Sequence, residues 1–109
     1  MKDKDINIAI AEACGWTHHS NRASKHAFEW ESPNSTYMSA PPSYTYDLNA
    51  MHKAEKVLTF DQSLLYADYL TETTEGLWAD HKRRLNCARA TAAQRAEAFL
   101  RTINKWEEL

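Results

Sequence analysis

A pair of prolines near the middle of the chain, Pro41-Pro42, limits what this sequence can fold into more than any other feature. A proline has no backbone N–H and disfavours helical backbone in the residue before it, so neither a helix nor a paired strand can run through the pair. We therefore expect an extended connection that continues through Ser43–Tyr46. It ends at Asp47, a residue typical of helix N-caps.

The residues after Asp47 follow the pattern of an amphipathic helix. Apolar side chains recur at steps of three and four residues, which places them on one face of a helix. They are Leu48, Met51, Ala54, Val57 and Leu58. We expect this helix to pack its apolar face on a sheet.

Three further segments are predicted to be helical. The first is Asp5–Cys14, with Gly15 where a left-handed C-terminal cap would lie. Asp61 is expected to cap the second, which ends within Thr71–Gly76. The third starts at Thr91–Gln94, which matches a reciprocal capping box. Their apolar positions are Ile6, Ala9, Ile10, Ala13 and Cys14; Leu64, Leu65, Ala67, Tyr69 and Leu70; and Ala96, Phe99, Leu100 and Ile103.

Strands are expected between the first helix and the prolines. In His26–Glu31 the side chains alternate, so that Phe28 and Trp30 share one face. A second short strand is expected over Thr36–Ser39, after the turn residues Ser32–Ser35.

These elements predict the fold class. A chain of 109 residues has room for one hydrophobic core, so we expect a single α+β domain over residues 1–109. Trp16 and Trp30 are expected in that core. Leu77–Asn86 fits an exposed strand and a helix equally, and we favour a strand.

The charge balance argues against generic DNA binding. The chain carries 13 Lys and Arg against 15 Asp and Glu, a formal charge of −2, so it has no global positive field to attract a phosphate backbone. One dense basic cluster is present, and we interpret it as a solvated face. It consists of Lys82, Arg83, Arg84 and Arg89.

Two features point to the cytoplasm. Cys14 and Cys87 are too few and too far apart for a disulfide scaffold, so reduced, buried thiols are expected. Met1–Asp5 carries acids where a signal peptide would be apolar, and no run of about 18 apolar residues follows. We expect no membrane partner.

Three stretches resemble the phage ABA-sandwich domain family, small proteins encoded by tailed phages. They are Ile8–Trp16, Tyr44–Glu55 and Ala90–Arg101. The resemblance implies an α/β/α sandwich, a small sheet flanked by helices on both faces, in the cytoplasm of a phage host. It implies no activity and no catalytic residue.

The sequence lacks the common signatures of catalysis. With only Gly15 and Gly76, it can build neither a P-loop nor a dinucleotide fingerprint, since each needs several glycines. Cys14 lies on the apolar stripe of its helix, which favours an inert core thiol over a nucleophile. We expect no enzyme and no cofactor.

Metal ligation is also disfavoured. His18 and His19 are adjacent in a predicted strand and point to opposite faces. His52 and Glu55 have the spacing of carboxylate metal sites, but such sites need further carboxylates from other helices.

The residues around the start of the helix after Asp47 could form a ligand-binding site. Tyr44 and Tyr46 precede a helix N-terminus, where free amides favour an anion, and arginines could add charge. The alternative is an aromatic hinge packed under the helix, with Asp47 occupying the amides. The candidate ligand-binding residues are Tyr44, Tyr46, Asn49, Arg83, Arg84 and Arg95.

Two functions fit this inventory. The first is a phage accessory protein that binds a small nucleotide-like host signal and sequesters it. The alternative is a protein-binding module that inhibits or recruits a host or phage protein, or a minor structural part of the virion. We also expect a homo-oligomer, because a small domain often closes an exposed edge strand with a second copy.

Overall fold

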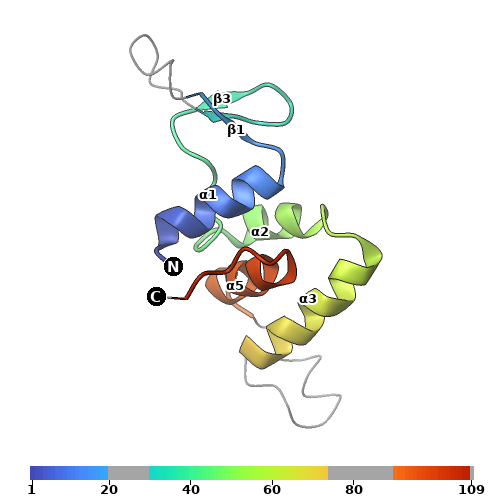
Figure 1. The fold of residues 1–109 in the computed structure, drawn as a ribbon. Helices are drawn as coiled ribbons and strands as arrows, with labels where there is room; N and C mark the ends of the chain where they lie inside the picture. Colours follow the sequence, from blue (N-terminus) through green and yellow to red (C-terminus); the bar gives the residue numbers. More distant parts are fainter. Residues whose placement is uncertain (20–29, 74–89, 109) are drawn as a thin grey trace.

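The computed structural model describes residues 1–19, 30–73 and 90–108. These residues form helices and a small antiparallel sheet, which confirms the α+β class (Figure 1). In chain order the elements are α1 (Asp3–Ala13), β1 (Thr17–His18), β2 (Trp30–Glu31), β3 (Tyr37–Met38), α2 (Leu48–Glu55), α3 (Phe60–Thr73) and α5 (Ala92–Thr102).

The sheet has the strand order β1-β2-β3, and both pairs are antiparallel. Trp30 at its centre pairs with His18 on one side and Met38 on the other. The predicted second strand and the turn before it are confirmed, because β3 follows a turn in which Ser35 has a φ of 66°. Of the first predicted strand, Trp30–Glu31 is described and forms β2, while Phe28 lies outside the described residues.

Helix α1 ends as its sequence predicts. Gly15 has a φ of +94°, in the left-handed region. The Trp16 N–H donates to the Ala11 carbonyl oxygen at 2.9 Å and the Gly15 N–H donates to that of Glu12 at 3.1 Å. These two bonds form a Schellman motif, which turns the chain out of the helix and into β1.

Helix α5 lies at the centre of the helical part and packs against α1, α2 and α3. Its predicted stripe is confirmed, because Ala96, Phe99 and Leu100 have no exposed surface. Ile10 from α1 and Met51 from α2 complete this core. In Figure 1, the sheet lies on one side of α1 and the other helices lie on the opposite side. Helix α2 therefore packs on α5, and α1 is the helix next to the sheet.

Two helices begin with the same side-chain cap. At α5, the Thr91 N–H donates to Gln94 Oε1 at 2.9 Å and the Gln94 N–H donates to Thr91 Oγ1 at 3.1 Å, the predicted capping box. At α3, Thr59 and Gln62 exchange the equivalent bonds, at 2.9 and 3.2 Å. The expectation that Asp61 caps this helix is wrong, because Asp61 lies in the first turn.

The two ends of the described chain meet. The Met1 ammonium donates to the Glu107 carbonyl oxygen at 3.2 Å, and Figure 1 shows the termini side by side. Within residues 1–19, 30–73 and 90–108, no helix is long and apolar enough to cross a membrane. The predictions for Leu77–Asn86, Cys87 and the basic cluster fall outside the described residues.

Candidate functional site

A hollow of about 440 Å³ lies between α2 and the turn that joins β2 to β3. This volume falls in the range of small-molecule sites. The lining is mostly apolar and contains two aromatic side chains, those of Trp16 and Tyr44. The other lining residues are Cys14, Pro33, Met38, Pro42, Asp47, Asn49, Ala50, Lys53, Ala54 and Val57.

Tyr44 forms part of the wall of this hollow. The Pro41-Pro42 connection carries it between α1 and α2, where only 3% of its surface is exposed. Burial raises the pKa of Tyr44, and the neighbouring Cys14 adds to this effect. Burial also raises the pKa of the Cys14 thiol, although a hydrogen bond with Tyr44 opposes the change. Both groups therefore stay protonated at neutral pH, and the wall carries no charge from them.

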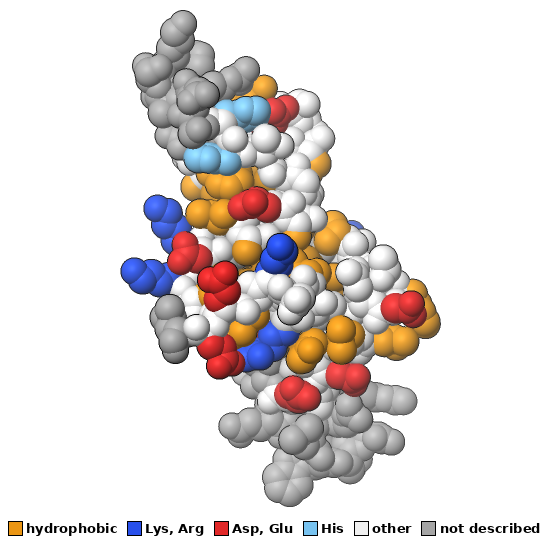
Figure 2. All heavy atoms as spheres, viewed as in Figure 1, with side chains coloured by type: hydrophobic (Ala, Val, Ile, Leu, Met, Phe, Trp, Pro, Cys, Tyr) orange, Lys and Arg blue, Asp and Glu red, His pale blue; other side chains and the backbone are white. Residues whose placement is uncertain are grey.

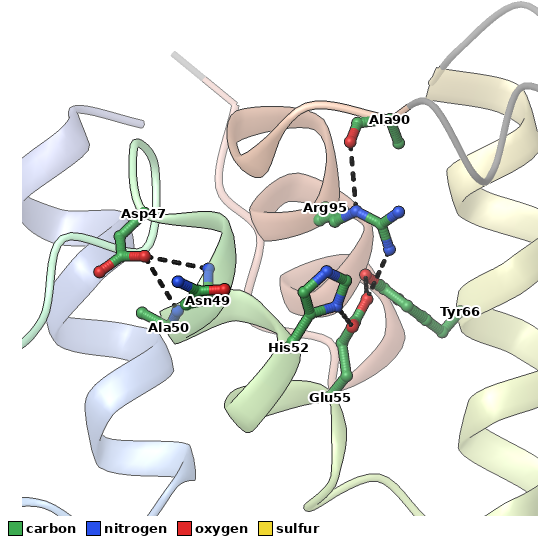
Figure 3. Close-up of polar contacts among 8 residues, drawn as sticks. All are labelled: Asp47, Asn49, Ala50, His52, Glu55, Tyr66, Ala90 and Arg95. Atoms are coloured by element: carbon green, nitrogen blue, oxygen red, sulfur yellow. Dashed lines mark hydrogen bonds and ion pairs between the residues drawn. The ribbon is translucent and has the colours of Figure 1, made fainter.

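The N-terminus of α2 borders the hollow, but its first amides are already satisfied. Asp47 Oδ1 accepts from the Asn49 N–H at 2.9 Å and from the Ala50 N–H at 3.3 Å (Figure 3). Asp47 is therefore the predicted N-cap, and its carboxylate occupies the position where an anion was expected to bind. Asn49 is exposed and lines the hollow, as a candidate ligand-binding residue should.

The positive charge at the hollow comes from Lys53, one turn further along α2. Its side chain is exposed and forms no ion pair with a described residue. Lys53 is not among the candidate residues predicted from the sequence. Lys53 could have been predicted as a candidate, because Asn49 and Lys53 are four residues apart and so share a face of the helix.

Two of the other candidates lie elsewhere. Tyr46 is 78% exposed, and its hydroxyl donates to Asp3 Oδ2 at 2.9 Å, away from the hollow's lining. Arg95 is buried and does not line the hollow; its Nη1 donates to Glu55 Oε2 at 3.0 Å and its Nε to the Ala90 carbonyl oxygen at 3.2 Å. Arg83 and Arg84 lie outside the described residues.

Arg95 belongs to a polar cluster that joins three helices (Figure 3). Glu55 from α2 is its centre, because it also accepts from the Tyr66 hydroxyl of α3 and lies 2.9 Å from His52 Nδ1. Burial raises the pKa of Glu55, but the hydrogen bonds from Tyr66, His52 and Arg95 and the charge of Arg95 outweigh it, so the pKa is lowered. Burial, followed by the contact with Glu55, raises the pKa of Tyr66.

The His52–Glu55 pair accordingly belongs to a structural cluster. Across the described parts of the chain, no three His, Cys, Asp or Glu side chains are grouped closely enough to hold a metal ion. His18 is the last residue of β1, and its ring lies 4.7 Å from that of Trp30. His19 follows β1, and its Nε2 lies 2.8 Å from Glu31 Oε1.

A second hollow, of about 730 Å³, separates α1 from the sheet. Its aromatic side chain is Trp30, whose ring is already covered by His18. Its charged side chains, Lys4 and Glu12, have opposite signs. Each hollow therefore contains one cation and one carboxylate. The hollow beside α2 is the better candidate for an anionic aromatic ligand, because its carboxylate, Asp47, already accepts from two backbone amides and its Trp16 ring is only half-buried.

Comparisons of the chain with protein-family models, with curated proteins and with solved structures gave no match. The resemblance to the phage ABA-sandwich family stays a prediction from the three sequence stretches.

Proposed function

We propose that the protein binds a small nucleotide-like molecule in the hollow beside α2 and releases it unchanged. The observation that carries this proposal is the position of Lys53, which forms no ion pair with a described residue and lies at the edge of a hollow lined by Trp16 and Tyr44. The base would lie against Trp16, the half-buried ring of the wall, because Tyr44 is only 3% exposed, and the phosphate would lie beside the Lys53 ammonium group. Asn49 supplies a hydrogen-bonding amide on the same face of α2.

The charge at the hollow favours a ligand with few phosphates. Stacking on an aromatic ring contributes roughly 1–3 kcal/mol per base, and a charge-assisted bond is stronger than a neutral one. However, the Asp47 carboxylate also borders the hollow and repels additional negative charge. We therefore expect mononucleotides and cyclic mononucleotides to bind better than polyphosphates.

The same side chains support binding without a reaction. Cys14 is the thiol in the hollow, and burial raises its pKa, so it is a poor nucleophile at neutral pH. The Asp47 carboxylate holds two backbone amides and is not positioned as a free base. Among residues 1–19, 30–73 and 90–108, neither group has the activating partner that nucleophilic or acid–base catalysis requires.

The resemblance to tailed-phage proteins suggests a biological role for such binding. We propose that the ligand is a host signalling nucleotide and that the protein sequesters it in the host cytoplasm. Sequestration needs tight binding and no turnover, which agrees with a hollow that offers aromatic contact and charge but no activated nucleophile.

Calorimetry with purified full-length protein tests this function. The panel contains nucleoside monophosphates, 3′,5′-cyclic mononucleotides, cyclic dinucleotides and nucleoside triphosphates. We expect at least one mononucleotide to bind with a Kd in the micromolar range or below, about −8 kcal/mol, and to be recovered intact by chromatography. At 100 times its Kd it should stabilise the fold by about 2.7 kcal/mol, which raises the Tm by on the order of 10 °C.

Two results would contradict the proposal. One is a panel in which no member changes the Tm. The other is a ligand that binds but is converted to a product, which would make the protein an enzyme.

A further inference from the structure

The hollow of about 730 Å³ between α1 and the sheet has a charged side chain at each end of its helical wall. Lys4, Ile8 and Glu12 of α1 line it at steps of four residues, so they lie one above the other on the helix. Lys4 and Glu12 are exposed, and neither forms an ion pair with another residue of the described chain. Both charges are therefore available to a ligand.

The distance between the two charged residues matches a short peptide. A helix rises about 1.5 Å per residue, so Lys4 and Glu12, eight residues apart, are separated by about 12 Å along α1. An extended peptide spans about 3.3–3.6 Å per residue, so three or four residues cover this distance. A free amino acid carries its ammonium and carboxylate groups on one carbon atom and cannot contact both ends.

The wall between the charges is largely apolar. Ile8 and Pro41 are half-buried and Ala40 is exposed, and all three line the hollow. Figure 2 shows hydrophobic side chains between the histidines and the nearest acidic side chain. These surfaces can take an apolar side chain of a ligand, whose transfer out of water is favourable.

Asn7 adds a hydrogen-bond donor to the same wall. Its Oδ1 accepts from the Thr45 N–H at 3.2 Å, which fixes the orientation of the amide. The Asn7 NH2 group is therefore the part that can donate to a ligand, and a peptide carbonyl oxygen is a suitable acceptor.

We propose that this hollow binds a free peptide of three or four residues in its zwitterionic form. The peptide carboxylate pairs with the Lys4 ammonium group, and the peptide ammonium group pairs with the Glu12 carboxylate. Lys4 lies in the first turn of α1 and Glu12 in the last, so the helix dipole favours the same orientation. None of the lining residues belongs to the hollow beside α2, so the proposal is independent of nucleotide binding.

An NMR titration of the full-length protein at about pH 7 tests the ligand class. The probes are leucine and the tetrapeptide Ala-Leu-Leu-Ala, prepared with free ends, with an acetylated N-terminus or with an amidated C-terminus. We expect the free-ended tetrapeptide to bind with a Kd below about 1 mM and to shift the side-chain amide signal of Asn7. Leucine and each blocked tetrapeptide should bind about fivefold more weakly, because each lacks one of the two ion pairs.

Matched variants assign each end of the peptide. Glu12→Gln should weaken the free-ended tetrapeptide about fivefold and leave the acetylated one unchanged, because the acetylated peptide has no ammonium group to pair. Lys4→Gln should act in the same way on the free-ended and amidated peptides. Lys2→Gln and Asp5→Asn are the controls, because both residues are exposed near the start of α1 and do not line the hollow. All four variants should keep the wild-type Tm within a few degrees.

Three outcomes would overturn the proposal. The first is a free-ended tetrapeptide that causes no shifts at a concentration of about 10 mM. The second is equal affinity for the free-ended and both blocked tetrapeptides, since the chain ends are then not recognised. The third is a loss of affinity in Asp5→Asn as large as that in Glu12→Gln, which would show a general effect of charge on α1.

Discussion

Glu55 and Arg95 lie 40 residues apart in the sequence and form an ion pair, with 3.0 Å between Arg95 Nη1 and Glu55 Oε2. The pair joins the end of α2 to the first turns of α5, and Tyr66 connects it to α3. Arg95 is therefore committed to holding the helices together.

Removing one partner of this pair should destabilise the fold. Their side chains are 11% and 19% exposed, so the remaining charge is largely desolvated in a single variant. We expect Arg95→Met to lower the free energy of unfolding by on the order of 2 kcal/mol in urea denaturation. Nucleotide affinity should not change, because Arg95 does not line the hollow. A stable Arg95→Met protein with lost nucleotide binding would contradict this role.

The Glu55 cluster also predicts how stability depends on pH. Burial raises the pKa of Glu55, but the hydrogen bonds from Tyr66, His52 and Arg95 have the larger, opposite effect. The pKa of Glu55 is therefore lower in the folded protein than in the unfolded chain. The stabilisation is therefore complete above the ordinary carboxyl pKa of about 4.3 and is lost as the pH falls through the folded pKa. We expect the Tm of Glu55→Gln to fall less than that of wild type between about pH 5 and pH 3. Parallel curves would exclude Glu55 from this effect.

The left-handed cap at Gly15 predicts a cost for any side chain there. At a φ of +94°, an added Cβ is strained, and it would lie 3.3 Å from Pro33 Cγ. We expect Gly15→Ala to lower the free energy of unfolding by about 1–2 kcal/mol. Glu12→Ala, on the exposed side of the same helix, serves as the control and should be nearly neutral. An unchanged denaturation midpoint for Gly15→Ala would contradict the Schellman assignment.

The two capping boxes should respond alike. Thr91→Ala leaves the Gln94 amide of α5 without its acceptor, and Thr59→Ala does the same to Gln62 in α3. Each should lower the free energy of unfolding by about 1 kcal/mol. Asp61→Ala, by comparison, should change it by less than half as much, because Asp61 accepts no capping bond that the structure describes. A larger effect at Asp61 than at Thr59 would restore Asp61 as the cap.

Local signals were sufficient for much of the fold. The Gly15 cap, the Asp47 cap, the Thr91–Gln94 box and the strand near Tyr37 follow from neighbouring residues and short-range bonds. The Thr59–Gln62 box could have been predicted too, because it repeats the spacing of Thr91 and Gln94. Asp61 is a common cap residue two positions further on, and for that reason the sequence predicts it as the cap.

Contacts between side chains far apart in the sequence, and the burial of individual side chains, could not be predicted. The sequence could not show that Arg95 turns toward Glu55 at the end of α2, because this contact depends on how α5 crosses α2. Tyr44 and Tyr46 have the same residue type and lie in one short segment, yet one is buried and the other is 78% exposed. Their difference comes from the turn at Ser43, where the Tyr46 and Asp47 N–H groups donate to the Ser43 carbonyl oxygen at 3.1 and 2.8 Å.

If Lys53 helps to hold a nucleotide-like ligand beside the aromatic wall, two lysines of the same region should differ in their effect on binding. Lys53 lines the hollow, whereas Lys56, three residues later at the end of α2, does not. Each is replaced by Gln, and calorimetry measures the Kd for the tightest-binding nucleotide of the panel. We expect Lys53→Gln to weaken binding about tenfold and Lys56→Gln to change it by less than about twofold. Equal losses in both variants, or no loss in Lys53→Gln, would contradict this role of Lys53.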